Sequence, residues 1–169
     1  MNDFVRMSLQ AARQGTILDT NLLLLFLIGC WNAQKIADFE RTSDYSMEDF
    51  RLLRKLLDQS KQLVTTPHIL TEVCNLTESL NKNNDYKLFK ILAGIQSYAK
   101  ERRQEAAYLM GENFHKPFLR LGIADTSLLD ASVKGHLILT DDAACATSIY
   151  QAGGLVLNIN HLRSKDWLT

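Results

Sequence analysis

Four short apolar runs, separated by stretches with helical periodicity, constrain the fold of this chain more than any other feature of its sequence. Each run is too short for a helix and too uniformly apolar for a strand that has one face in solvent. Strands covered on both faces have this pattern, and they are typical of parallel sheets. The runs are Thr16-Ile17-Leu18, Leu63-Val64-Thr65, Leu137-Ile138-Leu139 and Leu155-Val156-Leu157. We expect each of them to be a strand of one buried sheet.

The alternation of these runs with helical stretches predicts right-handed strand–helix–strand crossovers. Thr66-Pro67 supplies a cap residue and a first-turn proline for one helix, and Gly153-Gly154 ends another before the last run. The expected fold class is therefore α/β, a three-layer α/β/α sandwich with a central, mainly parallel sheet. Ligand sites in such sheets lie beyond the carboxyl ends of the strands.

The chain has 169 residues and 46% hydrophobic content, which is enough for one substantial core and too little for two. We expect a single domain over residues 1–169. Two segments extend it. A polar, partly helical excursion occupies about residues 32–62, with an amphipathic helix over residues 47–60. Added helices occupy about residues 84–115, where apolar positions recur at helical spacing.

Charge and cysteine content limit the classes of protein to which the chain can belong. The formal net charge is zero, so contact with a nucleic acid must come from local basic patches. Three cysteines without paired spacing argue against a disulfide framework and a zinc site. The apolar run at residues 22–28 is about a third of the length of a membrane span, and the N-terminus lacks a signal-type pattern. We expect a soluble, unprocessed, cytoplasmic protein with no membrane partner.

Acidic residues stand where the predicted strands run into helices. Asp19 directly follows the first run, the Asp141-Asp142 pair follows the third, and Asp125 opens a helix that ends near Lys134. Each position also suits a helix cap, because aspartate accepts hydrogen bonds from the free backbone N–H groups at a helix start. For each aspartate taken alone, capping and a functional role remain alternatives.

Glu72 is the acid that capping explains least. A helix that starts at Pro67 places it on one face with Ile69 and Leu76, and we expect that face to be buried. A buried carboxylate is costly unless it is paired or binds a metal. An interior salt bridge is the structural alternative.

The positions of these acids predict one shared cation site. Several carboxylates within a few ångströms raise one another's pKa, whereas a divalent cation with oxygen ligands removes the repulsion. A carboxylate cluster that holds Mg²⁺ or Mn²⁺ suits phosphodiester hydrolysis. The sequence therefore indicates a hydrolase whose cofactor is one of these two ions.

Four segments, in this order along the chain, resemble the PIN domains, a family that includes the VapC-type toxin ribonucleases of bacterial toxin–antitoxin pairs. The segments are Ile17-Leu18-Asp19-Thr20-Asn21, Thr66-Pro67-His68-Ile69-Leu70-Thr71-Glu72, Ile123-Ala124-Asp125-Thr126-Ser127-Leu128-Leu129-Asp130-Ala131 and Leu137-Ile138-Leu139-Thr140-Asp141-Asp142. Each motif is weak alone, and the ordered set is more specific. The chain departs from small members of the family in its longer excursion between Cys30 and Gln62.

The resemblance assigns roles to individual residues. It makes Asp19, Glu72 and Asp125 metal ligands and catalytic residues, with Thr20 and Asn21 as supporting residues. The family's fourth acid usually follows a threonine by two positions. Counted from Thr140, that rule favours Asp142, although the adjacent Asp141 remains an alternative.

The function implied by the resemblance is a metal-dependent endoribonuclease that cuts single-stranded RNA, with DNA as the less expected substrate. An antitoxin or another protein partner and a homodimer are compatible with it. Basic residues that would guide the strand are Lys100, Arg102, Arg103, Lys116 and Arg120, although ordinary solvated charges would look the same.

Two other functions fit parts of the pattern. One is a catalytically inactive PIN-fold scaffold that binds RNA or protein, against which the full set of acids argues. The other is a phosphoacceptor signalling domain, which would need a lysine after the last strand, where this chain has Asn158. Metal binding separates the first of these from the nuclease.

Overall fold

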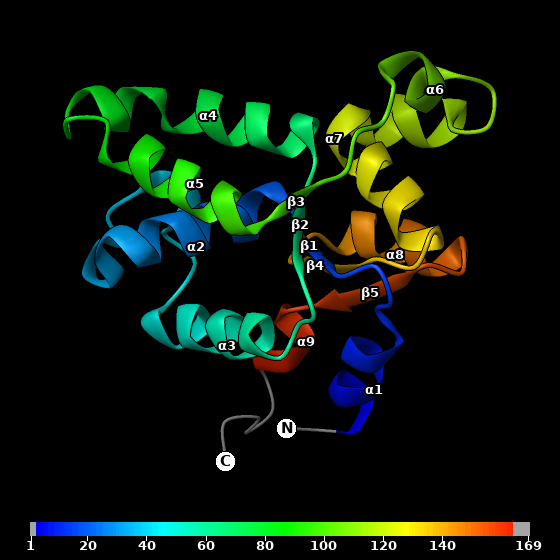
Figure 1. Cartoon of the computed structure of the whole chain (residues 1–169), viewed down its shortest axis with the longest axis horizontal. Coiled ribbons are helices and arrows are strands. Elements are labelled where there is room, and N and C mark those ends of the chain that lie inside the picture. The colour runs from blue at the N-terminus through cyan, green and yellow to red at the C-terminus, as the bar shows by residue number, and fades with distance from the viewer. Residues whose placement is uncertain (1–2, 164–169) are drawn as a thin grey trace.

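The computed structural model describes residues 3–163 and shows an α/β fold built on a parallel sheet (Figure 1). Within these residues five strands pair in the order β3-β2-β1-β4-β5, and every pairing is parallel. The strands are β1 (Thr16–Leu18), β2 (Leu63–Thr65), β3 (Lys100–Glu101), β4 (Leu137–Thr140) and β5 (Leu155–Asn158). The expected three-layer fold is confirmed, because helices cover both faces of this sheet.

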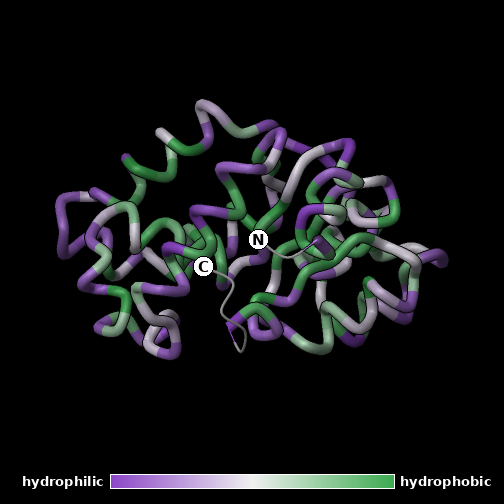
Figure 2. Tube along the Cα trace, turned by 90° about the horizontal axis from the view of Figure 1, so that it is seen from below, coloured by the Kyte–Doolittle hydropathy of each residue, from purple (hydrophilic) through white to green (hydrophobic). Residues whose placement is uncertain are grey.

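The two central strands explain why the apolar runs lack alternation. Every residue of β1 and β4 is buried, and Ile17 of β1 lies opposite Ile138 of β4. A strand buried on both faces has no polar side to show in the sequence. Hydrophilic segments lie mainly at the outer turns of the chain, and hydrophobic ones run through its interior (Figure 2).

Helices form the two outer layers (Figure 1). One face of the sheet carries α2 (Thr20–Asn32), α3 (Met47–Asp58), α4 (Pro67–Lys82) and α5 (Lys87–Tyr98). The other carries α1 (Asp3–Ala11), α7 (His115–Val133) and α8 (Ala143–Gln151). Two short helices, α6 (Ala106–Met110) and α9 (Asn160–Arg163), complete the described chain. None of the helices formed by residues 3–163 is both long and apolar enough to cross a bilayer.

Helix α2 is the centre of its layer. Its residues Leu22 to Leu25, Leu27 and Ile28 are all buried, so the apolar run belongs to the core. Gly29 continues this buried surface, and a Cβ atom there would collide with the ring of Phe50 on α3. A glycine is therefore required where α2 and α3 cross.

The two extensions expected from the sequence are present, with differences. The excursion contains two 3₁₀ turns, η1 (Ala33–Lys35) and η2 (Glu40–Thr42), before α3, which begins with a capping box between Ser46 and Asp49. Within residues 84–115 the helices are α5 and α6, and α7 begins at the end of this segment. Between α5 and α6 lies β3, an edge strand that the sequence did not predict.

Helix α7 is broken at Gly122, whose backbone adopts φ 82° and ψ 179°. Only glycine adopts this conformation readily, because an L side chain would clash with the backbone. The break starts a new helical segment at Ile123, two residues before Asp125. It fixes where the Asp125 carboxylate enters the site described below.

Candidate metal centre

Asp19 lies at the carboxyl end of the central strand β1 and is only 5% exposed. It is the N-cap of α2, because its Oδ1 accepts a hydrogen bond of 2.8 Å from the Leu22 N–H. Its Oδ2 accepts a longer bond of 3.2 Å from the Asp141 N–H, at the end of β4. Capping is thus confirmed for Asp19, and the same side chain ties two neighbouring strand ends together.

Burial raises the pKa of Asp19 from its ordinary value of 3.8 to about 7. The charge of Asp141 adds to this rise, and hydrogen bonds with the Thr140 side chain and with the Leu22 and Asp141 backbone oppose it. The hydrogen bonds therefore fail to compensate for the water that this carboxylate has lost. A nearby cation would restore its ordinary ionisation.

Asp141 is held from two directions. Its Oδ1 accepts from the Asn21 amide at 3.1 Å, and its Oδ2 accepts from the Tyr45 hydroxyl at 2.7 Å. Burial raises the pKa of Tyr45, and so do its hydrogen bond to Asp141 and the charges of Asp141 and Asp19. Tyr45 therefore stays protonated and remains a donor to Asp141.

Tyr45 is the functional candidate that sequence reasoning missed. It belongs to the excursion and lies 96 residues from Asp141 in the chain, and nothing in its local pattern indicates the contact. The guanidinium of Arg163 lies 5.0 Å from the centre of its ring and also pairs with Asp49 at 2.8 Å. The excursion is thereby anchored to the carboxyl edge of the sheet.

Glu72 lies on α4 and is exposed, so the expectation that it faces the core is wrong. The helix buries Ile69 and Val73 instead, and Glu72 sits at the border of that stripe. Its Oε2 accepts a hydrogen bond of 2.7 Å from the Thr20 hydroxyl at the start of α2. That contact brings Glu72 to the first turn that follows Asp19.

Asp125 is the least compensated acid of the group. Within residues 3–163 its carboxylate makes no hydrogen bond or ion pair. Burial raises its pKa to about 6, and the charges of Asp142 and Glu72 contribute to the rise. The capping alternative does not hold for Asp125, because it lies inside a helical segment and accepts no bond from a backbone N–H in the described chain.

Asp142 caps α8, and its Oδ1 accepts from the N–H groups of Ala144 and Cys145 at 2.6 and 3.0 Å. Its Oδ2 makes no hydrogen bond in the part of the chain described by the structure. The Thr140 hydroxyl accepts from the Asp142 N–H at 3.0 Å and also bonds the Asp19 carboxylate. Thr140 therefore links the two caps.

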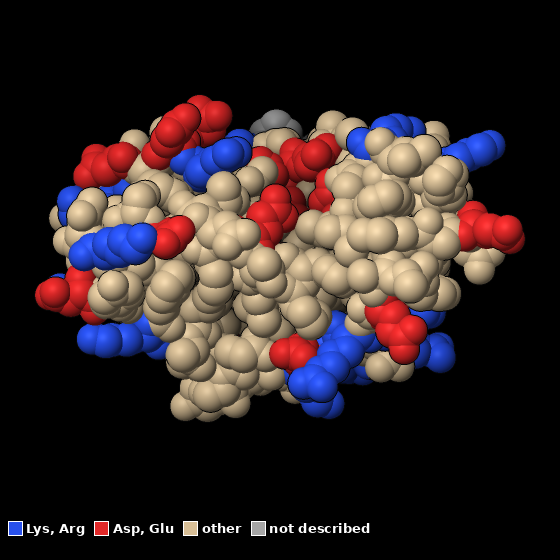
Figure 3. All heavy atoms as spheres, turned by 90° about the horizontal axis from the view of Figure 1, so that it is seen from above, with Lys and Arg blue, Asp and Glu red and all other residues tan. Residues whose placement is uncertain are grey.

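The buried thiol of Cys145 lies within the electrostatic reach of three of these acids. Burial raises its pKa, and the charges of Asp125, Asp19 and Asp142 all add to the rise. Figure 3, a view from above relative to Figure 1, shows acidic side chains gathered in a hollow between two lobes. The predicted acids thus meet at one edge of the sheet, although they come from distant parts of the sequence.

The candidate ligands suit a hard divalent cation better than a softer metal ion. Every candidate ligand is a carboxylate oxygen, which suits Mg²⁺ and Mn²⁺ and not the softer metals. Among the described residues no three His, Cys, Asp or Glu side chains already stand at coordination geometry. Asp125 and one oxygen of Asp142 have no hydrogen-bond or ion-pair partner among residues 3–163, so they are the ligands that would move into place at least cost.

The basic residues expected to guide RNA are divided between three places. One pocket is lined by Lys100, Arg102 and Arg103. It also contains residues that precede β1, β2 and β4, so it lies at the edge of the sheet opposite the acids. Lys116 lines a separate pocket of about 640 Å³ between α6 and α7. Arg120 donates a hydrogen bond to the Ser148 hydroxyl on α8.

The chain matches no protein-family model, no curated protein and no solved structure.

Proposed function

We propose that this protein is a metal-dependent endoribonuclease that hydrolyses phosphodiester bonds in single-stranded RNA. The observation that carries the proposal is the state of Asp125, a partly buried carboxylate without a hydrogen bond or ion pair in the described chain, next to Asp142 and Glu72. Such an arrangement destabilises the metal-free fold and has no structural benefit. It is explained if a cation belongs among these groups.

Glu72, Asp125, Asp142 and Asp19 are the side chains that would hold Mg²⁺ or Mn²⁺. Bound there, the ion would supply an activated water and would neutralise the charge that develops on a phosphate during hydrolysis. The order of the four acids along the chain resembles that of the PIN domains, which supports this choice of chemistry and of RNA as the substrate. Unstacked single strands are also the form of RNA that proteins most readily reach.

The hydrogen bonds favour Asp142 over Asp141 as the fourth ligand. Both Asp141 oxygens already accept bonds, from Asn21 and from Tyr45, so this side chain is suited to a positioning role. Asp142 keeps one oxygen free among residues 3–163, and its charge acts on Asp125. Thr20, through its bond to Glu72, would position the ligand on α4.

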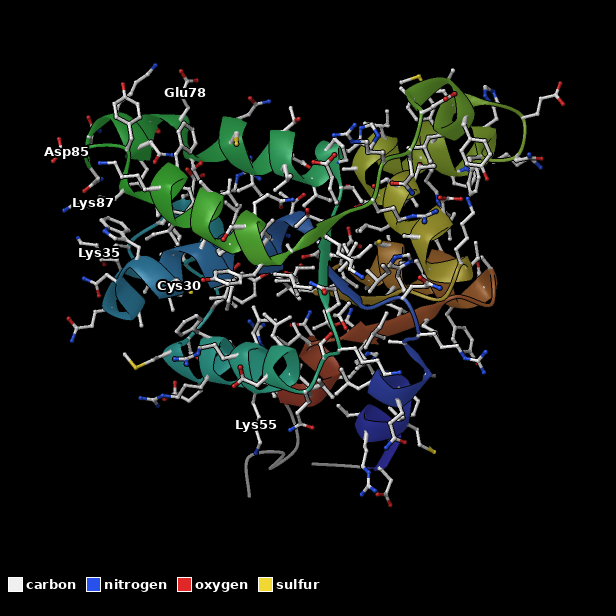
Figure 4. The ribbon with its side chains drawn as sticks, viewed as in Figure 1. Cys30, Lys35, Lys55, Glu78, Asp85 and Lys87 are labelled. Atoms are coloured by element: carbon white, nitrogen blue, oxygen red, sulfur yellow. The ribbon has the colours of Figure 1, made fainter. Side chains whose placement is uncertain are left out.

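The test is cleavage of labelled single-stranded RNA and single-stranded DNA, each with Mn²⁺ and with a chelator. We expect the wild-type protein to cut RNA with Mn²⁺ only, and Asp125→Asn to lose on the order of 100-fold or more in rate, as removal of one charge-stabilising group typically does. The matched control is Glu78→Gln, an outward-facing acid on α4 paired with Lys82 (Figure 4). It should cut normally.

The same assay decides against the proposal in a defined way. RNA that is bound and never cut, with Mn²⁺ present, would favour the inactive scaffold. Equal cleavage by wild type and Asp125→Asn would remove Asp125 from the site. For a toxin of a toxin–antitoxin pair, expression of the wild-type chain should halt growth and expression of Asp125→Asn should not.

A further inference from the structure

A second pocket, of about 460 Å³, lies at the opposite edge of the sheet from the carboxylates. It is formed by residues that directly precede three strands, among them Gly15, Gln62 and His136, and by the segment that contains β3. Its volume falls in the range of sites that bind small molecules. The carboxylate site does not extend to this pocket. The acids lie at the carboxyl ends of the strands, whereas these pocket residues lie at the amino ends.

The charge of this pocket is strongly one-sided. Its basic side chains outnumber the single acid, Glu101, which is already paired with Arg103 at 2.6 Å. Arg102 is also neutralised, since it pairs at 2.9 Å with Asp130, whose side chain is fully buried. The remaining cations form no ion pair within the described chain, and they are Arg13, Lys61 and Lys100.

Three unpaired cations that share one pocket repel one another unless an anion lies between them. No Phe, Tyr or Trp lines the pocket in the described part of the chain, so no ring is available to stack on a base. Lysine and arginine without an aromatic platform recognise the charge of a phosphate and not the identity of a base. Arg102 adds a buried Nε–H that finds no acceptor among residues 3–163.

We propose that this pocket is a phosphate-binding site, separate from the carboxylate site. The phosphate comes either from a small phosphorylated molecule or from the backbone of an RNA strand, and both sources present the same chemistry to Arg13, Lys61 and Lys100. The site needs no divalent metal, because its own side chains supply the positive charge.

The test is binding of two probes in the presence of a chelator: inorganic pyrophosphate, followed by calorimetry, and a fluorescent single-stranded RNA, followed by anisotropy. The variant is Lys61→Glu with Lys100→Glu, because both side chains are exposed and the fold does not depend on them. The control is Lys87→Glu with Lys90→Glu, two exposed positions on α5 whose replacement changes the net charge equally. Lys87 lies at the start of α5, at the end of the helix away from β3 (Figure 4).

We expect pyrophosphate to bind the wild type and the control alike, and the pocket variant about tenfold or more weakly. If RNA is the source, pyrophosphate displaces it, and the logarithmic salt slope of RNA binding falls by about 1.4 in the pocket variant, for two lost phosphate contacts. If a small molecule is the source, RNA binding is equal in all three proteins.

Two results would overturn the proposal: no binding of pyrophosphate to the wild type, or equal weakening in the pocket variant and the control. Because metal is excluded throughout, neither result bears on the nuclease. Loss of cleavage in Asp125→Asn with pyrophosphate binding unchanged would show that the two sites are independent.

Discussion

Replacing Asp19 with asparagine should make the metal-free protein more stable at pH 8 and leave it nearly unchanged at pH 5. Asp19 is buried, and its pKa is about 7 in the folded chain against an ordinary 3.8. At pH values between these two pKa values, the folded state binds more protons than the unfolded state. The stability of the wild type therefore falls as pH rises from about 4 through 7.

The size of the effect follows from the shift. Each pKa unit is worth about 1.4 kcal/mol, so ionisation of Asp19 costs the folded state about 4 kcal/mol above pH 7 and less than half of that at pH 5. Asparagine keeps the oxygen that caps α2 and loses the acceptor for the Asp141 N–H, at a cost of about 1 kcal/mol. The variant should gain about 3 kcal/mol at pH 8 and almost nothing at pH 5.

The assay is urea denaturation of both proteins at pH 5 and pH 8 with a chelator present. Asp125 and all other titrating groups are common to the two proteins, so the difference between them isolates Asp19. Saturating Mn²⁺ should restore the stability of the wild type at pH 8 and stabilise the variant less. An identical pH dependence in the two proteins, without metal, would refute the reasoning that ionised Asp19 is uncompensated.

Three further substitutions test single features of the structure. Tyr45→Phe removes the hydroxyl that donates a hydrogen bond to Asp141. The free energy of unfolding measured in urea should therefore fall by about 1.5 kcal/mol, and RNA cleavage should slow. Unchanged cleavage would show that Tyr45 has no positioning role. Gly122→Ala should destabilise the fold by about 1 to 3 kcal/mol in the same experiment, because alanine does not tolerate the backbone at the break in α7. Gly94→Ala, in open space on α5, should instead stabilise it by about 0.5 to 1 kcal/mol, and a loss at both glycines would contradict the conformational explanation.

Much of the fold was predictable because its core strands are apolar throughout. The runs at Ile17, Val64, Ile138 and Val156 each became a strand of the sheet. Strand β3 was not predictable, because both residues of Lys100–Glu101 are exposed and the pairing with β2 uses backbone groups alone. A strand held only by its backbone leaves no pattern of side chains in the sequence.

The sequence predicted which acids lie at the carboxyl ends of the strands, and it described their surroundings less well. Asp19 and Asp142 follow strands, so their meeting at the carboxyl edge could be expected, and both also serve as caps. Helical periodicity predicted that Glu72 is buried. Periodicity shows only which side of a helix a residue lies on, and it does not distinguish the centre of the buried face from its border. Tyr45 reaches Asp141 only through the folded excursion, a contact that no local pattern can encode.

The most direct measurement is the binding of Mn²⁺ to the purified protein, followed by electron paramagnetic resonance or calorimetry. One Mn²⁺ site per chain should appear. Glu72→Gln and Asp125→Asn should each lower the Mn²⁺ affinity by more than the roughly 10- to 100-fold that follows loss of a residue hydrogen-bonded to a metal ligand. Glu78→Gln should bind like the wild type. If Mn²⁺ does not bind the wild type at millimolar concentration, or binds all four proteins equally, these carboxylates do not share a cation.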